Sequence, residues 1–134
     1  MKEASYAEAE GYPTGELKHG PNALVSDNVP LVALATFDPA VDASVLRYEK
    51  TLQLLREMKT QGARVIAIAN AGDKSVVNLV MECIEVSAAP EHLLPITEVV
   101  PLRLFAYFMA MERGVNIDRP RNLTKAVVEN STGT

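Results

Sequence analysis

The sequence predicts a three-layer α/β domain of flavodoxin-like style, in which a short parallel sheet lies between helices. Two short apolar runs, at residues 30–35 and 64–70, are typical of strands buried on both faces of a parallel sheet. Between them, residues 44–61 carry apolar side chains at helical spacing. A strand, a helix and a second strand in this order form one crossover unit, so the two strands are expected to be parallel.

The first half of this unit is well bounded in the sequence. Pro30–Ala35 is almost continuously apolar and is predicted to be a strand. A helix is predicted over Ser44–Gln61, with Asp42 or Ser44 available to cap its start and Gly62 to end it. The apolar face of this helix consists of Val45, Tyr48, Leu52 and Leu55.

The second half follows directly. Arg64–Asn70 is again short and apolar, which indicates the second strand. A turn then leads into a short helical segment over Ser75–Leu79, and Cys83–Val86 gives a third, shorter strand. The sheet is therefore expected to contain at least three strands.

A long helix is predicted near the end of the chain. Leu93–Arg113 is rich in apolar residues and reads as a mostly buried helix that Gly114 ends. Pro95 and Pro101 should bend this helix or mark its first turns. We expect one domain over residues 1–129, because 134 residues suit a single core, and a disordered tail over Asn130–Thr134.

The beginning of the chain differs in character. Tyr6–Glu10 alternates between apolar and acidic residues, as a strand does. Pro13–Pro21 follows and is dense in turn-forming and ionisable residues. Open α/β sheets bind their ligands at loops of this kind beyond the carboxyl ends of strands.

Composition excludes several classes of protein. A formal net charge of −4 argues against nucleic-acid binding, because such surfaces are usually basic. We also expect no membrane partner, because no apolar stretch approaches the ~20 residues needed to span a bilayer. The single cysteine, Cys83, precludes a disulfide within the chain, and we expect a cytoplasmic protein.

Three residues could carry chemistry, although their own sequence context does not decide it. His19 lies in the N-terminal loop, where its near-neutral pKa would suit proton transfer, but an ordinary surface histidine is equally expected. Acidic residues near the chain start, Glu3 among them, are usually only solvated, and a lysine such as Lys125 is more often exposed than catalytic. We expect no metal or other cofactor, because the sequence contains no metal-ligand spacing and no glycine-rich phosphate loop.

Three stretches resemble a known family, and this resemblance favours catalytic roles for the three residues. The resemblance is to the second sugar isomerase (SIS) domain of the glucosamine-6-phosphate synthases, also called glutamine:fructose-6-phosphate aminotransferases (isomerizing). The closing Pro-Arg-Asn-Leu-x-Lys pattern is its most specific part. The stretches are Glu8–Pro21, Val100–Tyr107 and Asp118–Val127.

The resemblance implies an activity and three catalytic residues. Members of the family transfer ammonia from glutamine to fructose 6-phosphate and isomerise the product to glucosamine 6-phosphate. Lys125 matches the lysine that forms a Schiff base with the open-chain ketose. Glu3 matches the carboxylate that moves a proton between C1 and C2, and His19 the histidine that opens the sugar ring, which in that family comes from a neighbouring subunit.

The resemblance also implies that the domain is incomplete at its front edge. The family's glutaminase domain, its first SIS domain and the opening strand of the second would not be part of this chain, which could be a natural truncation, an expressed fragment or half of a split enzyme. An open sheet edge or apolar face would then favour a homo-oligomer or pairing with a missing N-terminal half. Activity of the isolated chain is left open. The alternative is a non-catalytic SIS module that binds sugar phosphates in a regulator.

Overall fold

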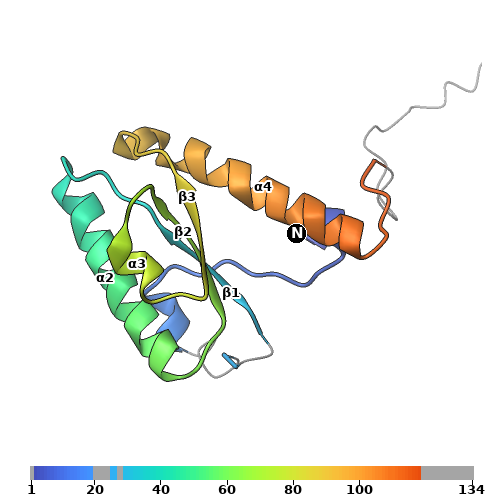
Figure 1. The fold of residues 1–134 in the computed structure, drawn as a ribbon, viewed down its shortest axis with the longest axis horizontal. Coiled ribbons are helices and arrows are strands. Elements are labelled where there is room, and N and C mark those ends of the chain that lie inside the picture. The colour runs from blue at the N-terminus through green and yellow to red at the C-terminus, as the bar shows by residue number, and fades with distance from the viewer. Residues whose placement is uncertain (1, 20–24, 27–28, 119–134) are drawn as a thin grey trace, which may run out of the picture. The chain divides into compact units, whose positions relative to one another are not determined.

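The structure is a computed structural model that describes residues 2–19, 25–26 and 29–118 (Figure 1). The described chain divides into two compact units, residues 1–9 with 104–134 and residues 10–103, and each is treated by itself. The elements in chain order are α1 (Lys2–Ser5), a 3₁₀ helix (Glu16–His19), β1 (Leu31–Ala35), α2 (Asp42–Thr60), β2 (Val65–Asn70), α3 (Lys74–Val77), β3 (Glu82–Val86), a second 3₁₀ helix (Glu91–Leu93) and α4 (Leu94–Glu112).

The described strands form one parallel sheet in the order β1-β2-β3. Leu31 pairs with Val65 at the start of β1, and Ala35 pairs with Ala69 at its end. On the other side of β2, Ile66 pairs with Glu82 and Asn70 with Val86. The predicted α/β class, its short parallel sheet and the three strands predicted at residues 30–35, 64–70 and 83–86 are therefore confirmed.

The core of the larger unit lies between α2 and one face of the sheet. Leu55 and Met58 of α2 are each 1% exposed and belong to one apolar cluster with Val65 and Ala67 of β2. The short α3 packs beside α2, and its Val76 is fully buried in the same cluster. Of the apolar face predicted for α2, Leu52 and Leu55 are buried, whereas Val45 and Tyr48 are partly buried.

The boundaries of α2 are partly as predicted. Gly62 takes a left-handed conformation with φ +75°, and Ala63 N–H donates to the Met58 carbonyl at 3.0 Å, so the helix ends in a Schellman motif as expected. The predicted side-chain N-cap is wrong, because Val41 occupies that position. Ser44 lies inside the first turn, fully buried, where its Oγ accepts a 2.9 Å hydrogen bond from Asp38 N–H.

The expectation of a strand over Tyr6–Glu10 is wrong. The residues before it form the one-turn helix α1, and Tyr6 follows with a positive φ of 51° while its N–H donates to the Lys2 carbonyl at 3.1 Å. This is a left-handed helix end, which a tyrosine adopts at a cost of about 1–2 kcal/mol. The alternation of apolar and acidic residues therefore did not indicate a strand.

The long helix α4 confirms the predicted element but not its burial. Gly114 ends it with φ +63° and Val115 N–H donates to the Ala110 carbonyl at 3.0 Å, while Pro101 lies inside the helix and is buried. Most of its large apolar side chains are nevertheless exposed, such as Ile96 at 62% and Phe108 at 59%. The prediction of a mostly buried helix is wrong because no described element covers that face.

The expectation that no apolar stretch approaches the length of a membrane span is wrong for the helical stretch Glu91–Glu112. It spans 22 residues and is long and apolar enough to cross a membrane by length and composition, although core helices of soluble proteins pass the same test. Leu94 and Pro101, seven residues apart and so on one side of it, are buried. A helix that packs one face against its own protein differs from one that meets lipid all round.

A substitution in the core cluster tests the packing of α2. We expect Leu55→Ala to lower the free energy of unfolding by about 2–5 kcal/mol, because it leaves a cavity in a fully buried site. Leu46→Ala on the same helix is the matched control, since Leu46 is 53% exposed and its truncation should change stability by less than about 0.5 kcal/mol. Urea unfolding measures both, and equal costs would contradict this packing.

Candidate functional site

The three predicted catalytic residues lie in different parts of the chain. Glu3 is an exposed residue of α1 in the smaller unit, and His19 is the last residue of the 3₁₀ helix Glu16–His19 in the larger unit. Lys125 lies outside the described residues, as do the predicted domain end at residue 129 and the tail. Their convergence on one cavity stays a prediction.

The loop that carries His19 is anchored to α2. The Pro13 carbonyl accepts hydrogen bonds from Glu16 N–H at 2.9 Å and from Leu17 N–H at 3.3 Å, which closes a tight turn. Leu17 packs against the core cluster, and the Thr14 hydroxyl lies 3.4 Å from the buried Thr51 hydroxyl of α2. These contacts hold the start of the histidine-bearing helix against the domain.

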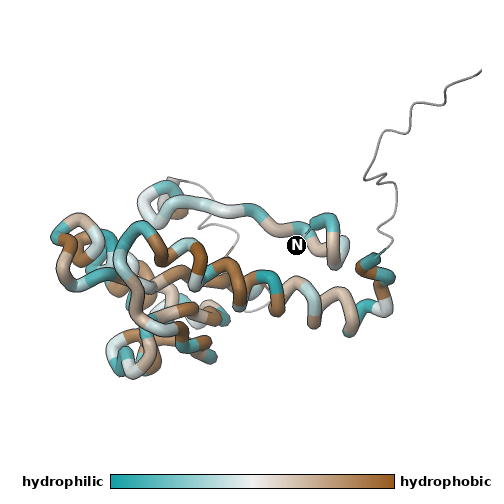
Figure 2. The backbone as a smooth tube through the Cα atoms, turned by 90° about the horizontal axis from the view of Figure 1, so that it is seen from above, coloured by the Kyte–Doolittle hydropathy of each residue, from teal (hydrophilic) through white to brown (hydrophobic). Residues whose placement is uncertain are grey.

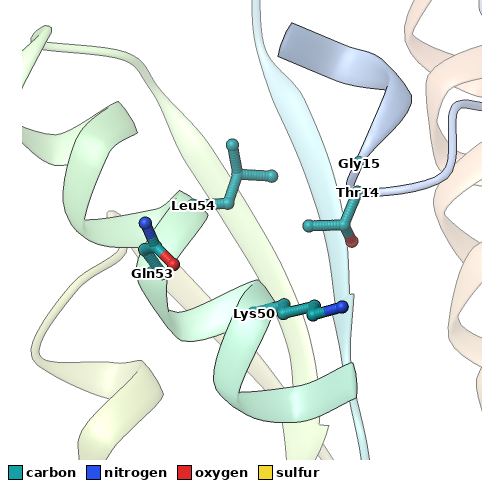
Figure 3. Close-up of a pocket in the computed structure, with 5 residues that line it drawn as sticks. All are labelled: Thr14, Gly15, Lys50, Gln53 and Leu54. Atoms are coloured by element: carbon teal, nitrogen blue, oxygen red, sulfur yellow. The ribbon is translucent and has the colours of Figure 1, made fainter. Parts of the chain in front are cut away.

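A shallow pocket of about 210 Å³ lies between this loop and α2. Its lining residues are Thr14, Gly15, Lys50, Gln53 and Leu54. Figure 3 shows the Thr14 and Lys50 side chains extending into the space between the two segments. The pocket thus offers a hydroxyl, an amide and a cation, a set of groups that can contact a polar or anionic ligand.

Glu3 is held by contacts within the smaller unit. Ser5 and Ala7, on either side of the left-handed turn, are buried. Arg113 donates to the Ser5 carbonyl at 3.4 Å and to the Tyr6 carbonyl at 3.2 Å, so a cation satisfies the carbonyls at the carboxyl end of α1. This arrangement fixes the end of α1 and leaves the Glu3 carboxylate in solvent.

A polar network that the sequence analysis did not single out occupies the carboxyl edge of the sheet. Asn70, at the end of β2, donates from its side chain to the Phe37 carbonyl at 2.7 Å, which ties the exits of β1 and β2 together. The buried Thr36 hydroxyl, one residue beyond β1, donates to the Glu98 carboxylate of α4. The network therefore begins by joining both strand ends to the first turns of α4.

A charged clamp continues the network. The Asp38 carboxylate accepts from Glu91 N–H at 3.0 Å, and Arg47 of α2 pairs with Glu91 through both of its terminal nitrogens, one at 3.1 Å. The Arg47 hydrogen bond, supported by Ser44, lowers the pKa of Glu91 to about 2, and the same bond raises the pKa of Arg47. The clamp fixes the 3₁₀ turn before α4 to the start of α2.

A second set of polar contacts braces the end of β2. Tyr48 donates its hydroxyl proton to Asp73 at 2.6 Å, and burial together with this carboxylate raises the pKa of Tyr48 to about 12. Asp73 also caps α3 by accepting from Ser75 N–H at 2.9 Å. The Tyr48 ring stacks on Phe37 with centroids 4.2 Å apart.

The hydrogen bonds at the carboxyl edge of the sheet support the fold rather than carry chemistry. The carboxylates of Asp38, Asp73, Glu91 and Glu98 all accept hydrogen bonds from the protein, so they act as a scaffold at the edge where α/β domains bind ligands. Among the described residues, no group of three His, Cys, Asp or Glu side chains could hold a metal ion. In the sequence, the one indication of this network is that Asp38 follows closely after the predicted strand Pro30–Ala35.

Comparison with known proteins shows which family this chain is similar to. The model of the SIS domain family matches residues 1–113. The chain is 46% identical over 127 residues to a glutamine–fructose-6-phosphate aminotransferase (isomerizing) of Thermus thermophilus, and 42% identical over 127 residues to its namesake in Chlorobaculum tepidum. Each match covers 95% of this chain and 20% of the relative, so the chain spans about a fifth of the length of these proteins.

Two solved structures share the fold. The C-terminal domain of glucosamine-fructose-6-phosphate aminotransferase from Francisella tularensis superimposes with a TM-score of 0.75 at 36% identity, over 88% of this chain and 31% of that one. Tagatose-6-phosphate ketose/aldose isomerase from Escherichia coli gives a TM-score of 0.54 at 24% identity, over 83% of this chain and 30% of that one. The second likeness concerns the fold alone.

The charged clamp predicts a specific dependence of stability on pH. Because the pKa of Glu91 is about 2 in the folded chain and about 4.5 when unfolded, its contribution is complete above pH 4.5 and is lost as pH falls towards 2. We therefore expect Glu91→Gln to lower the Tm at pH 7 and to match the native chain near pH 2. Glu49→Gln, at an exposed position of α2, controls for the loss of one negative charge. A Tm difference that does not change with pH would contradict the clamp.

Proposed function

This chain belongs to the SIS domain family, and from that membership we propose that it is the isomerase half of an enzyme that makes glucosamine 6-phosphate from fructose 6-phosphate and glutamine-derived ammonia. The observation that carries the proposal is the identity of 42–46% to aminotransferases of that name over 95% of the chain. A match of this extent includes most of the N-terminal loop and the closing Pro-Arg-Asn-Leu-x-Lys segment, since only 7 of 134 residues fall outside it.

Lys125 is assigned the covalent step. Its neutral amine adds to the carbonyl carbon of the open-chain ketose, and loss of water leaves a protonated imine. Ammonia then adds to the imine carbon and the Lys125 amine leaves, which transfers the imine to ammonia. The positive charge on the resulting protonated imine acidifies the hydrogen on the adjacent carbon and so prepares the sugar for isomerisation. A lysine is suited to this role because neighbouring cations or burial lower its pKa towards neutrality.

Glu3 and His19 are assigned the proton transfers. The Glu3 carboxylate takes a proton from C1 and returns it to C2, which converts the ketose skeleton to the aldose skeleton. His19 opens the ring by protonating the ring oxygen while the hydroxyl on the anomeric carbon loses its proton. The exposed position of Glu3 at the end of an anchored helix leaves its carboxylate accessible to a sugar.

The proposal also concerns the setting of the reaction. The chain is expected to work in the cytoplasm, on a sugar-phosphate intermediate of amino-sugar synthesis, and to need another chain. That chain would be either a second copy, which supplies His19 across the interface, or an N-terminal half with the phosphate-binding and nitrogen-supplying parts. The loop that carries His19 is anchored to α2 through Thr14 and Thr51, which is compatible with either arrangement.

Reductive trapping tests the covalent step. Fructose 6-phosphate and borohydride are added to the full chain, and peptide mass spectrometry locates the secondary amine that forms when hydride reduces the imine. We expect the adduct on Lys125 and its loss in Lys125→Arg, because the guanidinium does not form an imine under these conditions. Lys59→Arg is the matched control at an exposed lysine, and it should leave the yield unchanged.

Binding without trapping distinguishes the alternative. If fructose 6-phosphate binds by calorimetry, no adduct forms and Lys125→Ala binds equally well, the chain is a sugar-phosphate-binding module rather than part of the enzyme. If neither binding nor an adduct is detected even after addition of the N-terminal portion of a relative, the proposal is wrong.

Mixing two variants tests whether His19 acts across chains. We expect His19→Asn alone to give several-fold less adduct, because ring opening then limits the supply of open-chain sugar. Addition of the Lys125→Ala chain, which forms no adduct itself, should restore the yield on the His19→Asn chain. The absence of any restoration, with both variants folded by circular dichroism, would place His19 in the site of its own chain.

A further inference from the structure

Arg113 connects two segments of the smaller unit that lie far apart in the sequence. Hydrophobic colouring recurs along α4 in Figure 2, whereas the charged residues Glu112 and Arg113 stand at its end. From there the Arg113 guanidinium donates through one nitrogen, Nη1, to the carbonyls of Ser5 at 3.4 Å and Tyr6 at 3.2 Å. The cation therefore contacts the last residue of α1 and the residue that follows it.

The end of α1 depends on contacts from outside the helix, because the last carbonyls of a helix need donors beyond their own turn. Ser5 is fully buried, and Tyr6 takes a φ of 51°, a left-handed conformation that strains a residue other than glycine. Lys2 and Glu8 also form an ion pair across this turn, but exposed pairs contribute little in water. Hydrogen bonds from a cation are stronger than neutral ones, so Arg113 is the main support of the turn.

We infer that Arg113 is a positioning residue for Glu3. The inference rests on the function proposed above, in which the Glu3 carboxylate moves the proton of the sugar. Glu3 lies two residues before Ser5 in a helix of four residues, which is too short to keep its own conformation. By donating to the carbonyls of Ser5 and Tyr6, Arg113 fixes this helix and with it the direction of the Glu3 side chain.

The position of Glu3 matters for one step of the proposed reaction. Proton transfer from C1 needs the carboxylate within hydrogen-bond reach of that carbon's hydrogen, and a misplacement of about 1 Å can cost roughly 100-fold in rate. Formation of the imine at Lys125 does not use the Glu3 carboxylate. Loss of Arg113 should therefore slow proton transfer and leave imine formation unchanged, whereas a general loss of structure would reduce both.

Deuterium uptake by the sugar separates the two steps. In D₂O with fructose 6-phosphate and ammonium chloride, the Glu3 carboxylate takes a C1 proton from the protonated imine, exchanges it with solvent and returns a deuteron to the sugar. We expect Arg113→Met to give the borohydride-trapped Lys125 adduct within about twofold of the native yield, but to incorporate deuterium about tenfold more slowly by mass spectrometry. Arg103→Met is the matched control at an exposed position of α4 and should equal the native chain in both readouts.

The conservative variant tests the hydrogen bonds themselves. Arg113→Lys keeps a cation that can donate to a carbonyl, so its deuterium uptake should recover to within about threefold of the native rate. Circular dichroism and thermal unfolding establish that each variant folds, and Arg113→Gln replaces Arg113→Met if the methionine variant does not.

The outcomes separate this inference from the function on which it rests. Native deuterium uptake in Arg113→Met, a parallel loss of adduct and uptake, or an Arg113→Lys chain as slow as Arg113→Met would each overturn the positioning role alone. If the native chain forms no adduct even with the N-terminal portion of a relative, or if Glu3→Gln takes up deuterium at the native rate, the proposed function is wrong and the positioning role is lost with it. Slow uptake with a retained adduct and recovery in Arg113→Lys supports the inference.

Discussion

Burial of the central strand β2 is the constraint on which the larger unit depends. Val65, Ala67, Ile68 and Ala69 are each at most 2% exposed, because β1 and β3 pair with this strand on either side and α2 covers one face. A strand in that position must be apolar throughout and must have every backbone group paired. Pairing with β1 and β3 satisfies the backbone groups of β2, and packing of α2 buries the apolar side chains on one face of it.

The same constraint determines what lies at the carboxyl edge of the sheet. Where β1 and β2 end, the Asn70 side chain bonds to the Phe37 carbonyl, while Asp38 accepts from Glu91 N–H and Thr36 donates to the Glu98 carboxylate. Those side chains then connect to α2 and to the start of α4. A sheet edge of this kind is rigid, and rigid supports are what a ligand loop needs to hold its groups in position.

The chain presents its possible chemistry and its possible contacts on different elements. The N-terminal loop and α1 carry His19 and Glu3, whereas α4 carries exposed apolar side chains such as Ile96 and Phe108. The relatives are about five times as long as this chain. The exposed apolar side chains of α4 belong to a different element from the loop and the helix to which the proposed chemistry is assigned.

Local features of the sequence determined the elements and the family resemblance. Apolar runs predicted the strands, helical spacing predicted α2 and α4, and Gly62 and Gly114 marked the helix ends because glycine adopts positive φ without strain. The tertiary structure alone decided that α4 is exposed on one side, that Tyr6 ends a helix with a positive φ and that Ser44 lies inside α2. The physical reason is that periodicity belongs to consecutive residues, whereas burial and hydrogen-bond partners depend on segments distant in the chain.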